Sequence, residues 1–244
     1  MSPAEEERAF LEAYDKTAFD RPSVSVDVVI LTALDEALHA LLVRRDVLPQ
    51  RDRWALPGGF VRMDESLEQA ATRVLADKGG LADVYLEQLY TFGAVDRDPR
   101  MRVLSVAYVA LVAAGRVPPP TDGRVLARVD VPWEGEAGGP VDALGPDGAA
   151  LPLAFDHGDM LAMAVKRLRG KLNYTPIGYQ LLPPTFTLRA LQTVHETILG
   201  RALNKDSFRR RMLASGELEA TGEREQQVEH RPAELYRFVH QSAL

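Results

Sequence analysis

The stretch that decides the fold reads GFVRMDESLEQAATRVLADKGGL and spans residues 59–81. Ser66 and Gln69 have the spacing of a capping box, which satisfies two backbone N–H groups at the start of a helix. The apolar residues that follow recur with the spacing of one helix face, and they are Leu67, Ala70, Ala71, Val74 and Leu75. The pattern therefore predicts a helix from Ser66 to Lys78 that Gly79 terminates.

The same stretch resembles the signature of Nudix domains. That signature runs Gly, five residues, Glu, seven residues, then Arg-Glu-apolar-x-Glu-Glu-x-Gly-apolar. Residues 54–59 (WALPGG) are also similar to the strand and loop that enter it, and the resemblance covers about residues 20–155. It implies an α/β (α+β) protein whose N-terminal part is a Nudix-like α/β/α sandwich. At the matching spacing this chain keeps Gly59, Glu65, Arg73, Leu75, Gly80 and Leu81.

Three acidic positions of the signature have changed. In active members these acids lie at i, i+3 and i+4, so they share one helix face and hold a divalent metal beside a diphosphate. Here the three positions are Val74, Asp77 and Lys78. Mg²⁺ needs carboxylate ligands, and a cation ~4 Å away repels it by about 4 kcal/mol per charge at an effective dielectric of about 20. We therefore expect no catalytic residues, no metal site and no metal-assisted hydrolysis.

Nucleotide binding can persist without those acids. We hypothesise that Lys78 neutralises a pyrophosphate in place of the metal, which predicts binding without Mg²⁺ and its loss in Lys78→Glu. The alternative is that Lys78 only stabilises the last helical turn. Glu65 and Arg73 are better explained as fixing the loop against the helix. Arg44 and Arg45 can meet phosphates, although exposed arginines at the end of a strand are usually solvated. The residues predicted to bind an effector are Arg44, Arg45, Gly59, Glu65, Arg73, Asp77 and Lys78.

We call residues 59–81 the box. Strands and a further helix are predicted on both sides of it. Val24, Val26, Val28 and Ile30 alternate along residues 23–32, which places them on one face of a strand. Asp156 is expected to cap a later helix. Further strands are predicted at residues 40–45, 102–113 and 125–131, and a connector at residues 171–186.

Charge is unevenly spread along the 244 residues, whose formal net charge is −6. Residues 1–159 hold 16 basic and 27 acidic side chains, whereas residues 160–244 hold 13 basic and 8 acidic ones. A basic C-terminal part on an acidic body is typical of a polyanion-binding module.

The lack of cysteine excludes disulfides and thiolate chemistry. No apolar run approaches the ~18 residues of a membrane span and the start is acidic, so we expect a cytoplasmic protein.

The basic C-terminal part has the pattern of a helix-turn-helix. Thr187 is placed to cap a helix that Gly200 ends, and Asn204 caps a second helix after a short turn. In the second helix, Phe208, Met212 and Leu213 are expected to face the core. Lys205, Arg209 and Arg210 point elsewhere, as in a recognition helix that enters the major groove.

Two strands predicted at residues 218–221 and 235–238 complete a winged helix, with a charged loop between them. The alternative is that the arginines form a solvated face and the module binds a protein. His195 and His240 have no second ligand at metal spacing, so a zinc site is not expected. The residues predicted to bind DNA are Thr187, Lys205, Arg209, Arg210, Arg211, His230 and Arg231.

Nearly the whole chain resembles the Nudix-related transcriptional regulators of NAD metabolism (NrtR). The resemblance implies a homodimer that represses genes of NAD synthesis or salvage and releases its double-stranded operator when ADP-ribose or a related nucleotide binds. It also implies that hydrolase activity is usually absent and that no cofactor is required. The segments that carry it, besides the box, are residues 21–30, 92–99, 105–108, 155–157, 209–212 and 231–238.

The predicted division is a Nudix-like domain at 1–155 with an N-terminal arm at 1–20, a helix and connector at 156–186, and a winged helix at 187–244. Two other functions stay open. One is an active Nudix pyrophosphatase acting on ADP-ribose-like substrates, using Glu65 and Asp77 with Asp96 or Asp98. The other is a sensor whose C-terminal part binds a protein partner.

Overall fold

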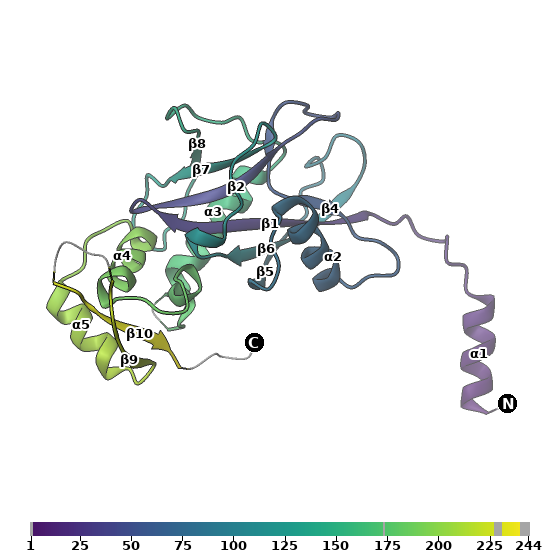
Figure 1. The fold of residues 1–244 in the computed structure, drawn as a ribbon. Coiled ribbons are helices and arrows are strands. Elements are labelled where there is room, and N and C mark those ends of the chain that lie inside the picture. Colours follow the sequence, from purple (N-terminus) through teal and green to yellow (C-terminus); the bar gives the residue numbers. More distant parts are fainter. Residues whose placement is uncertain (1, 173, 227–230, 240–244) are drawn as a thin grey trace.

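The computed structural model describes residues 2–172, 174–226 and 231–239. Strand β1 (Ser23–Leu34) lies in the middle of the main sheet, whose strands run in the order β5-β6-β1-β2-β7-β8. It pairs in parallel with β6 (Val103–Leu111) and antiparallel with β2 (Ala37–Arg44) (Figure 1). The remaining strands of this sheet are β3 (Trp54–Ala55), β4 (Gly58–Phe60), β5 (Tyr85–Phe92), β7 (Arg124–Asp130) and β8 (Asp142–Leu144).

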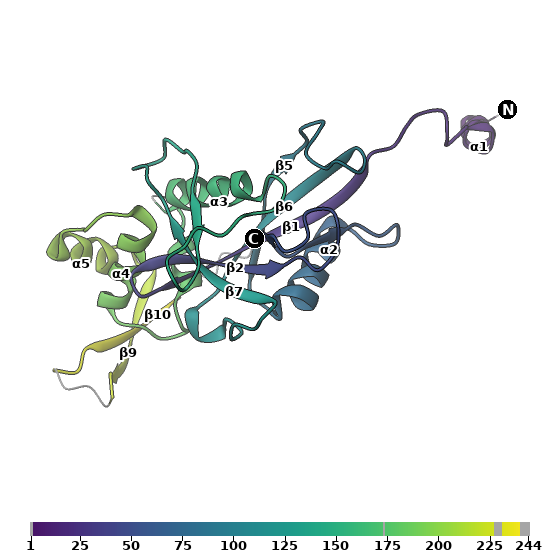
Figure 2. The ribbon, with the colours of Figure 1, turned by 90° about the horizontal axis from the view of Figure 1, so that it is seen from above.

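Strand β1 is buried on both faces because a helix covers each side of the sheet. Val28 and Ile30 pack on one face with helix α2 (Leu67–Val74). The alternate residues Val29 and Leu31 pack on the other face with helix α3 (His157–Lys171). Figure 2 shows α2 and α3 on opposite sides of the sheet. The α/β/α sandwich expected from the sequence is confirmed.

The helix of the box ends differently from the prediction. After α2 the chain continues as a π-helical turn, η1 (Leu75–Gly79), and Gly80 rather than Gly79 is the left-handed residue that ends it, with φ 69°. Gly79 packs closely on the core instead, because a Cβ there would lie 2.8 Å from Ile30 Cδ1 and would displace that side chain. The capping box of Ser66 and Gln69 is present.

Helix α3 begins where the sequence predicts, but the side chain of Asp156 does not cap it. Its carboxylate instead accepts hydrogen bonds from Arg97 Nε and Nη2, at 2.9 and 2.6 Å. This ion pair joins the start of α3 to the loop between β5 and β6.

The C-terminal residues form a winged helix, as expected. Helices α4 (Leu188–Leu199) and α5 (Lys205–Ala214) are followed by the hairpin of β9 (Leu218–Arg224) and β10 (Glu234–Phe238). Thr187 Oγ1 accepts the Ala190 N–H at 3.0 Å, and Asn204 Oδ1 accepts the Ser207 N–H at 3.0 Å. Both predicted N-caps are therefore present.

Three details of this region differ from the sequence analysis. Leu213 is 45% exposed and does not face the core, whereas Phe208 and Met212 do. The connector contains a 3₁₀ helix, η3 (Ile177–Leu181), whose Ile177 and Leu181 are buried against α4 and the sheet. The strands of the wing are also longer than predicted, since the hairpin pairs Glu234 with Arg224.

The chain starts with helix α1 (Pro3–Ala13), which stands clear of the rest of the molecule (Figures 1 and 2). A short 3₁₀ helix, η2 (Ala114–Arg116), follows β6. Within the described ranges, no helix has the length and apolar character needed to cross a membrane.

Candidate functional site

A cavity of about 530 Å³ opens where β1, β2 and β4 meet the β5–β6 loop and the start of α3. We call it the central cavity. Small-molecule sites typically have volumes of ~300–1,000 Å³, so its size suits a nucleotide. Its cationic side chains are Arg44, Arg45, Lys78, Arg97 and Arg100.

Three of these cations already have acidic partners. The distances between nitrogen and carboxylate oxygen lie between 2.6 and 3.0 Å in all three pairs. These arginines shape the wall, and a ligand must compete for their charge. The pairs are Arg44–Asp52, Arg97–Asp156 and Arg100–Asp98.

Arg45 and Lys78 form no ion pair with another described residue and donate to backbone carbonyls instead. Arg45 Nε donates to Pro49 O at 3.0 Å, and its guanidinium lies 4.8 Å from the Phe155 ring centroid. Burial lowers the pKa of Arg45. Lys78 Nζ donates to Gly58 O at 2.5 Å. Among the described residues, the positive charge of these two side chains is therefore not engaged in an ion pair.

A buried acid faces the same cavity. Asp27 is 6% exposed, accepts a hydrogen bond from Ser105 Oγ at 2.5 Å, and lies 3.6 Å from His157 Nε2. Burial lowers the pKa of His157, and its Nδ1 accepts the Leu56 N–H at 2.9 Å, so the proton lies on Nε2 toward Asp27. A Cβ on Gly58 would lie 1.8 Å from Asp27 Oδ1, so this acid requires a glycine beside it. We call Asp27, Ser105 and His157 the Asp27 cluster.

The structure brings some of the predicted effector residues to the central cavity and leaves others outside it. Arg44, Arg45, Gly59 and Lys78 line the cavity, whereas Glu65, Arg73 and Asp77 do not. These last three lie on the box but outside the cavity wall.

Glu65 and Arg73 pair with each other beside the cavity. Arg73 Nε donates to Glu65 Oε2 at 2.9 Å, and Arg73 Nη2 also bonds Phe60 O at 3.1 Å. The Arg73 guanidinium lowers the pKa of Glu65 to about 2. The pair holds the loop after β4 against α2, which is the positioning role weighed in the sequence analysis.

Several residues of the central cavity were not predicted as site residues from the sequence. Asp27, Arg97, Phe155 and His157 line the cavity, and Ser105 bonds Asp27 from β6. Each lies in a segment that carries the family resemblance, and this resemblance was the signal from which they could have been predicted. No spacing rule connects them, because they come from separate strands, a loop and a helix start.

The acids that a divalent metal requires are dispersed. Among the described residues, no group of three or more His, Cys, Asp or Glu side chains is placed to hold a metal ion. Val74, the last residue of α2, is 1% exposed and packs in the core between that helix and the sheet. Asp98 accepts three hydrogen bonds from Arg100, at 2.7 to 3.0 Å. These positions give a metal little to bind.

The predicted recognition helix presents its cations to solvent. Lys205, Arg209, Arg210 and Arg211 are exposed on α5, while Phe208 packs inward against His195 with ring centroids 5.0 Å apart. His195 is therefore a buried core residue, and burial lowers its pKa to about 4. The outer face of α5 has the charge and accessibility that duplex phosphates require.

The other residues predicted for DNA binding are placed differently. Thr187 is 7% exposed and uses its hydroxyl as a helix cap, so it positions α4. Arg231 is exposed in the loop between β9 and β10. His230 lies outside the described residues, as does His240.

Helix α3 connects the central cavity to the winged helix. Phe155 and His157 at its start line the cavity. Near its other end, Arg169 is 3% exposed and its Nε donates to Ile198 O at 2.8 Å, in the last turn of α4. Its Nη1 donates to Trp133 O at 2.7 Å.

Comparison with known proteins agrees with this two-part organisation. Residues 21–135 match the model of the NUDIX domain, and residues 178–238 match that of the NrtR DNA-binding winged helix domain. A protein of Acinetobacter baylyi, the ADPR responsive transcriptional repressor NtrR, is 39% identical over 235 residues, or 96% of this chain and 88% of that protein. The chain belongs to the NrtR family.

Solved structures of a family member align over most of the chain. The crystal structure of Shewanella oneidensis NrtR complexed with a 27-mer DNA has a TM-score of 0.72 and 35% identity, covering 88% of this chain and 93% of that one. The NUDIX domain of the same protein, complexed with ADP ribose, has a TM-score of 0.51 and 34% identity, covering 69% and 99%.

An enzyme is also among the relatives. The ADP-ribose pyrophosphatase of Methanocaldococcus jannaschii is 32% identical over 110 residues, which is 45% of this chain and 63% of that protein. The similarity to this enzyme therefore covers less than half of the present chain.

Proposed function

We propose that this chain is a transcriptional repressor whose winged helix binds double-stranded operator DNA and whose Nudix domain binds ADP-ribose or a related nucleotide as effector. The observation that carries the proposal is that one chain combines an exposed cationic face on α5 with a cavity lined by five cationic side chains. The DNA and the ADP-ribose named for the family relatives support it. No cofactor is required.

The central cavity is polar in a way that orients such a ligand. Arg45 and Lys78 provide positive charge for a diphosphate, since neither is engaged in an ion pair with another described residue. Asp27 is a buried acceptor that favours a hydroxyl or amino donor and repels a phosphate. The expected orientation therefore places the diphosphate near Arg45 and Lys78 and a donor-bearing group, such as a ribose diol, at the Asp27 cluster.

Helix α3 is the proposed connection between the two sites. The Arg97–Asp156 pair joins its start to a cavity loop, and Arg169 joins its end to the last turn of α4. With 15 residues it spans about 22 Å. A ligand that moves the cavity loop therefore shifts the helix-turn-helix, within the limit of its differential affinity for the two arrangements. We place the domain boundaries at residues 155 and 186, so the segment between them contains α3, the helix that also covers one face of the sheet.

We further propose that the protein acts as a homodimer on genes of NAD synthesis or salvage. Two winged helices at a fixed separation suit operator half-sites one or more helical turns apart. The Nudix domain is inactive as a hydrolase in this proposal. Val74 and Lys78 replace two acids of the active signature, and Arg100 engages the loop carboxylate Asp98.

Two assays on the purified full chain test this function. The DNA upstream of its own gene is expected to be retarded in a gel at low ionic strength. ADP-ribose incubated with protein and Mg²⁺ is expected to remain intact. Failure to retard promoter DNA excludes the regulator, and rapid metal-dependent cleavage of ADP-ribose supports the pyrophosphatase. If the C-terminal part instead binds a protein, promoter DNA is not retarded in the gel, although ADP-ribose still binds.

A further inference from the structure

Phe155 has a backbone conformation that is unfavourable for an aromatic residue. Its φ is 51°, in the left-handed region, whereas the other described non-glycine residues with positive φ are all Asp, Glu or Gln. A bulky side chain is strained in this region, and such strain is found where surrounding contacts impose it, often at ligand sites. The Phe155 ring lines the central cavity. The chain therefore keeps an aromatic ring on the cavity wall at a position where glycine would be less strained.

Contacts with β3 and with the loop between β2 and β3 hold Phe155 in this conformation. The preceding residue, Ala154, donates its N–H to Trp54 O on β3 at 2.8 Å. The N–H of Phe155 then donates to Gln50 Oε1 at 2.8 Å, and α3 begins two residues later. The chain thus turns at Phe155, from the edge of β3 into α3, with the ring on the cavity wall.

Arg45 extends the flat surface of this ring. Its guanidinium lies 4.8 Å from the Phe155 ring centroid, and its Nε donates to Pro49 O at 3.0 Å. A guanidinium stacks on flat groups through its face and donates hydrogen bonds through its edge. Arg45 can therefore offer its edge to a diphosphate while its face and the Phe155 ring remain a flat surface. We call this pair the Arg45–Phe155 platform.

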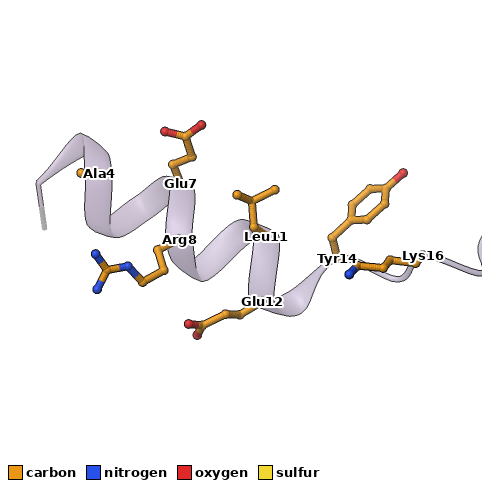
Figure 3. Close-up of a pocket in the computed structure, with 7 residues that line it drawn as sticks. All are labelled: Ala4, Glu7, Arg8, Leu11, Glu12, Tyr14 and Lys16. Carbon is orange, nitrogen blue, oxygen red and sulfur yellow. The ribbon is translucent and has the colours of Figure 1, made fainter. Parts of the chain in front are cut away.

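Two other aromatic sites differ from the platform. The Arg100 guanidinium lies 5.5 Å from the Phe60 ring centroid, but Arg100 is paired with Asp98 and Phe60 is 41% exposed. Figure 3 shows the hollow beside α1, where Tyr14 and the other lining side chains point to different sides of one exposed helix. The platform differs from both because its ring is half-buried and its backbone is fixed by a neighbouring loop.

We propose that the Arg45–Phe155 platform binds the purine base of the effector by stacking, and that the ribose bonded to this base lies at the Asp27 cluster. Nucleic-acid bases stack on aromatic rings and on guanidinium planes in proteins. The His157 ring of the cluster lies 5.6 Å from the Phe155 ring, so a base and its own ribose reach both. The inference rests on the nucleotide effector proposed above and adds which of its groups lies where.

Phe155→Leu tests the platform, because leucine keeps an apolar side chain at the same backbone position but has no ring. ADP-ribose and ribose 5-diphosphate, which lacks the base, are titrated calorimetrically into the full chain without Mg²⁺. Loss of stacking predicts about ten-fold weaker binding of ADP-ribose and unchanged binding of ribose 5-diphosphate. Phe92→Leu, at a half-buried ring of β5 outside the cavity wall, is the control and should change neither affinity.

The outcomes separate the platform from the effector itself. If Phe155→Leu weakens both ligands equally, the residue only shapes the cavity, and the platform is overturned. Unchanged ADP-ribose affinity in Phe155→Leu overturns it as well. If ADP-ribose does not bind the unsubstituted protein, the nucleotide effector proposed above fails together with the platform.

Saturation-transfer NMR of ADP-ribose with the unsubstituted full chain tests the order of the groups. Ligand protons closest to the protein become saturated most strongly. The protons H2 and H8 of adenine and those of the ribose bonded to it should therefore exceed the protons of the terminal ribose. Stronger saturation of the terminal ribose would place that sugar at the Asp27 cluster and overturn the proposed order.

Discussion

Arg169 Nε donates a hydrogen bond to Ile198 O at 2.8 Å, which links the end of α3 to the last turn of α4. The contact is closely packed, because a Cβ on Gly200 would lie 2.9 Å from Arg169 Nη2. The guanidinium also lies 4.5 Å from the Trp133 ring centroid. One buried side chain therefore joins the sandwich, its loop and the winged helix.

Arg169→Lys should uncouple the two sites. Lysine keeps the charge but cannot reach Ile198 O and Trp133 O together, so the relative placement of α3 and α4 loosens. We expect the ratio of operator dissociation constants with and without ADP-ribose to fall at least about five-fold. Fluorescence anisotropy with labelled operator measures that ratio. Arg167→Lys, on the same helix, is the control. An unchanged ratio in Arg169→Lys would contradict the proposed connection through α3.

Lys78→Glu should abolish nucleotide binding. It replaces one of the two cavity cations that form no ion pair with a described residue by an anion, which at ~4 Å and an effective dielectric of about 20 changes the interaction with a diphosphate by several kcal/mol. Calorimetric titration of ADP-ribose in EDTA is the measurement, and Lys166→Glu, exposed on α3, is the matched charge reversal. Unchanged affinity with a lower melting temperature would instead assign Lys78 to the helix end.

Asp27→Asn should change which ligand the cavity prefers. The substitution keeps the shape but removes the charge that accepts a donor, and such a hydrogen bond contributes ~1.5–3 kcal/mol. We expect Asp27→Asn to bind ADP-ribose about 10–100-fold more weakly than the unsubstituted protein does. An analogue that carries a phosphate on the ribose should instead bind Asp27→Asn more tightly than it binds the unsubstituted protein. Asp46→Asn, at another acid of the cavity wall, is the control. Equal losses for both ligands would contradict the proposed orientation.

Replacing Arg209, Arg210 and Arg211 together by Ala should eliminate operator binding. All three are exposed, so the fold and ADP-ribose affinity are expected to stay unchanged. Each phosphate contact contributes about 0.9 to the magnitude of the slope of log affinity against log salt concentration. If the variant still binds weakly, the magnitude of this slope should therefore be smaller by up to about 2.7. Arg128→Ala on β7 serves as the control. Retained operator affinity would show that α5 is not the recognition helix.

The sequence predicts those elements whose signals are local. The alternation along β1 and the caps at Ser66, Thr187 and Asn204 lie within a few residues of the structure they specify. Leu213 was misplaced because helical spacing alone does not set where a packed face ends.

The site is harder to predict because its parts are distant in sequence. The Asp27 cluster joins Asp27 to Ser105, 78 positions away, and to His157, which also accepts a hydrogen bond from Leu56, 101 positions away. Asp156 was expected as a cap, and only the fold places Arg97 beside it. Tertiary ion pairs of this kind override a local preference.

We expect nucleotide and DNA binding to oppose each other in one molecule, as the family resemblance implies. Titrating ADP-ribose into the complex of full-length protein and labelled operator, at fixed salt without Mg²⁺, tests it most directly. We expect release of the DNA with a midpoint that rises with operator concentration, and no release from the Lys78→Glu complex. Operator binding that stays constant across saturating ADP-ribose would contradict it.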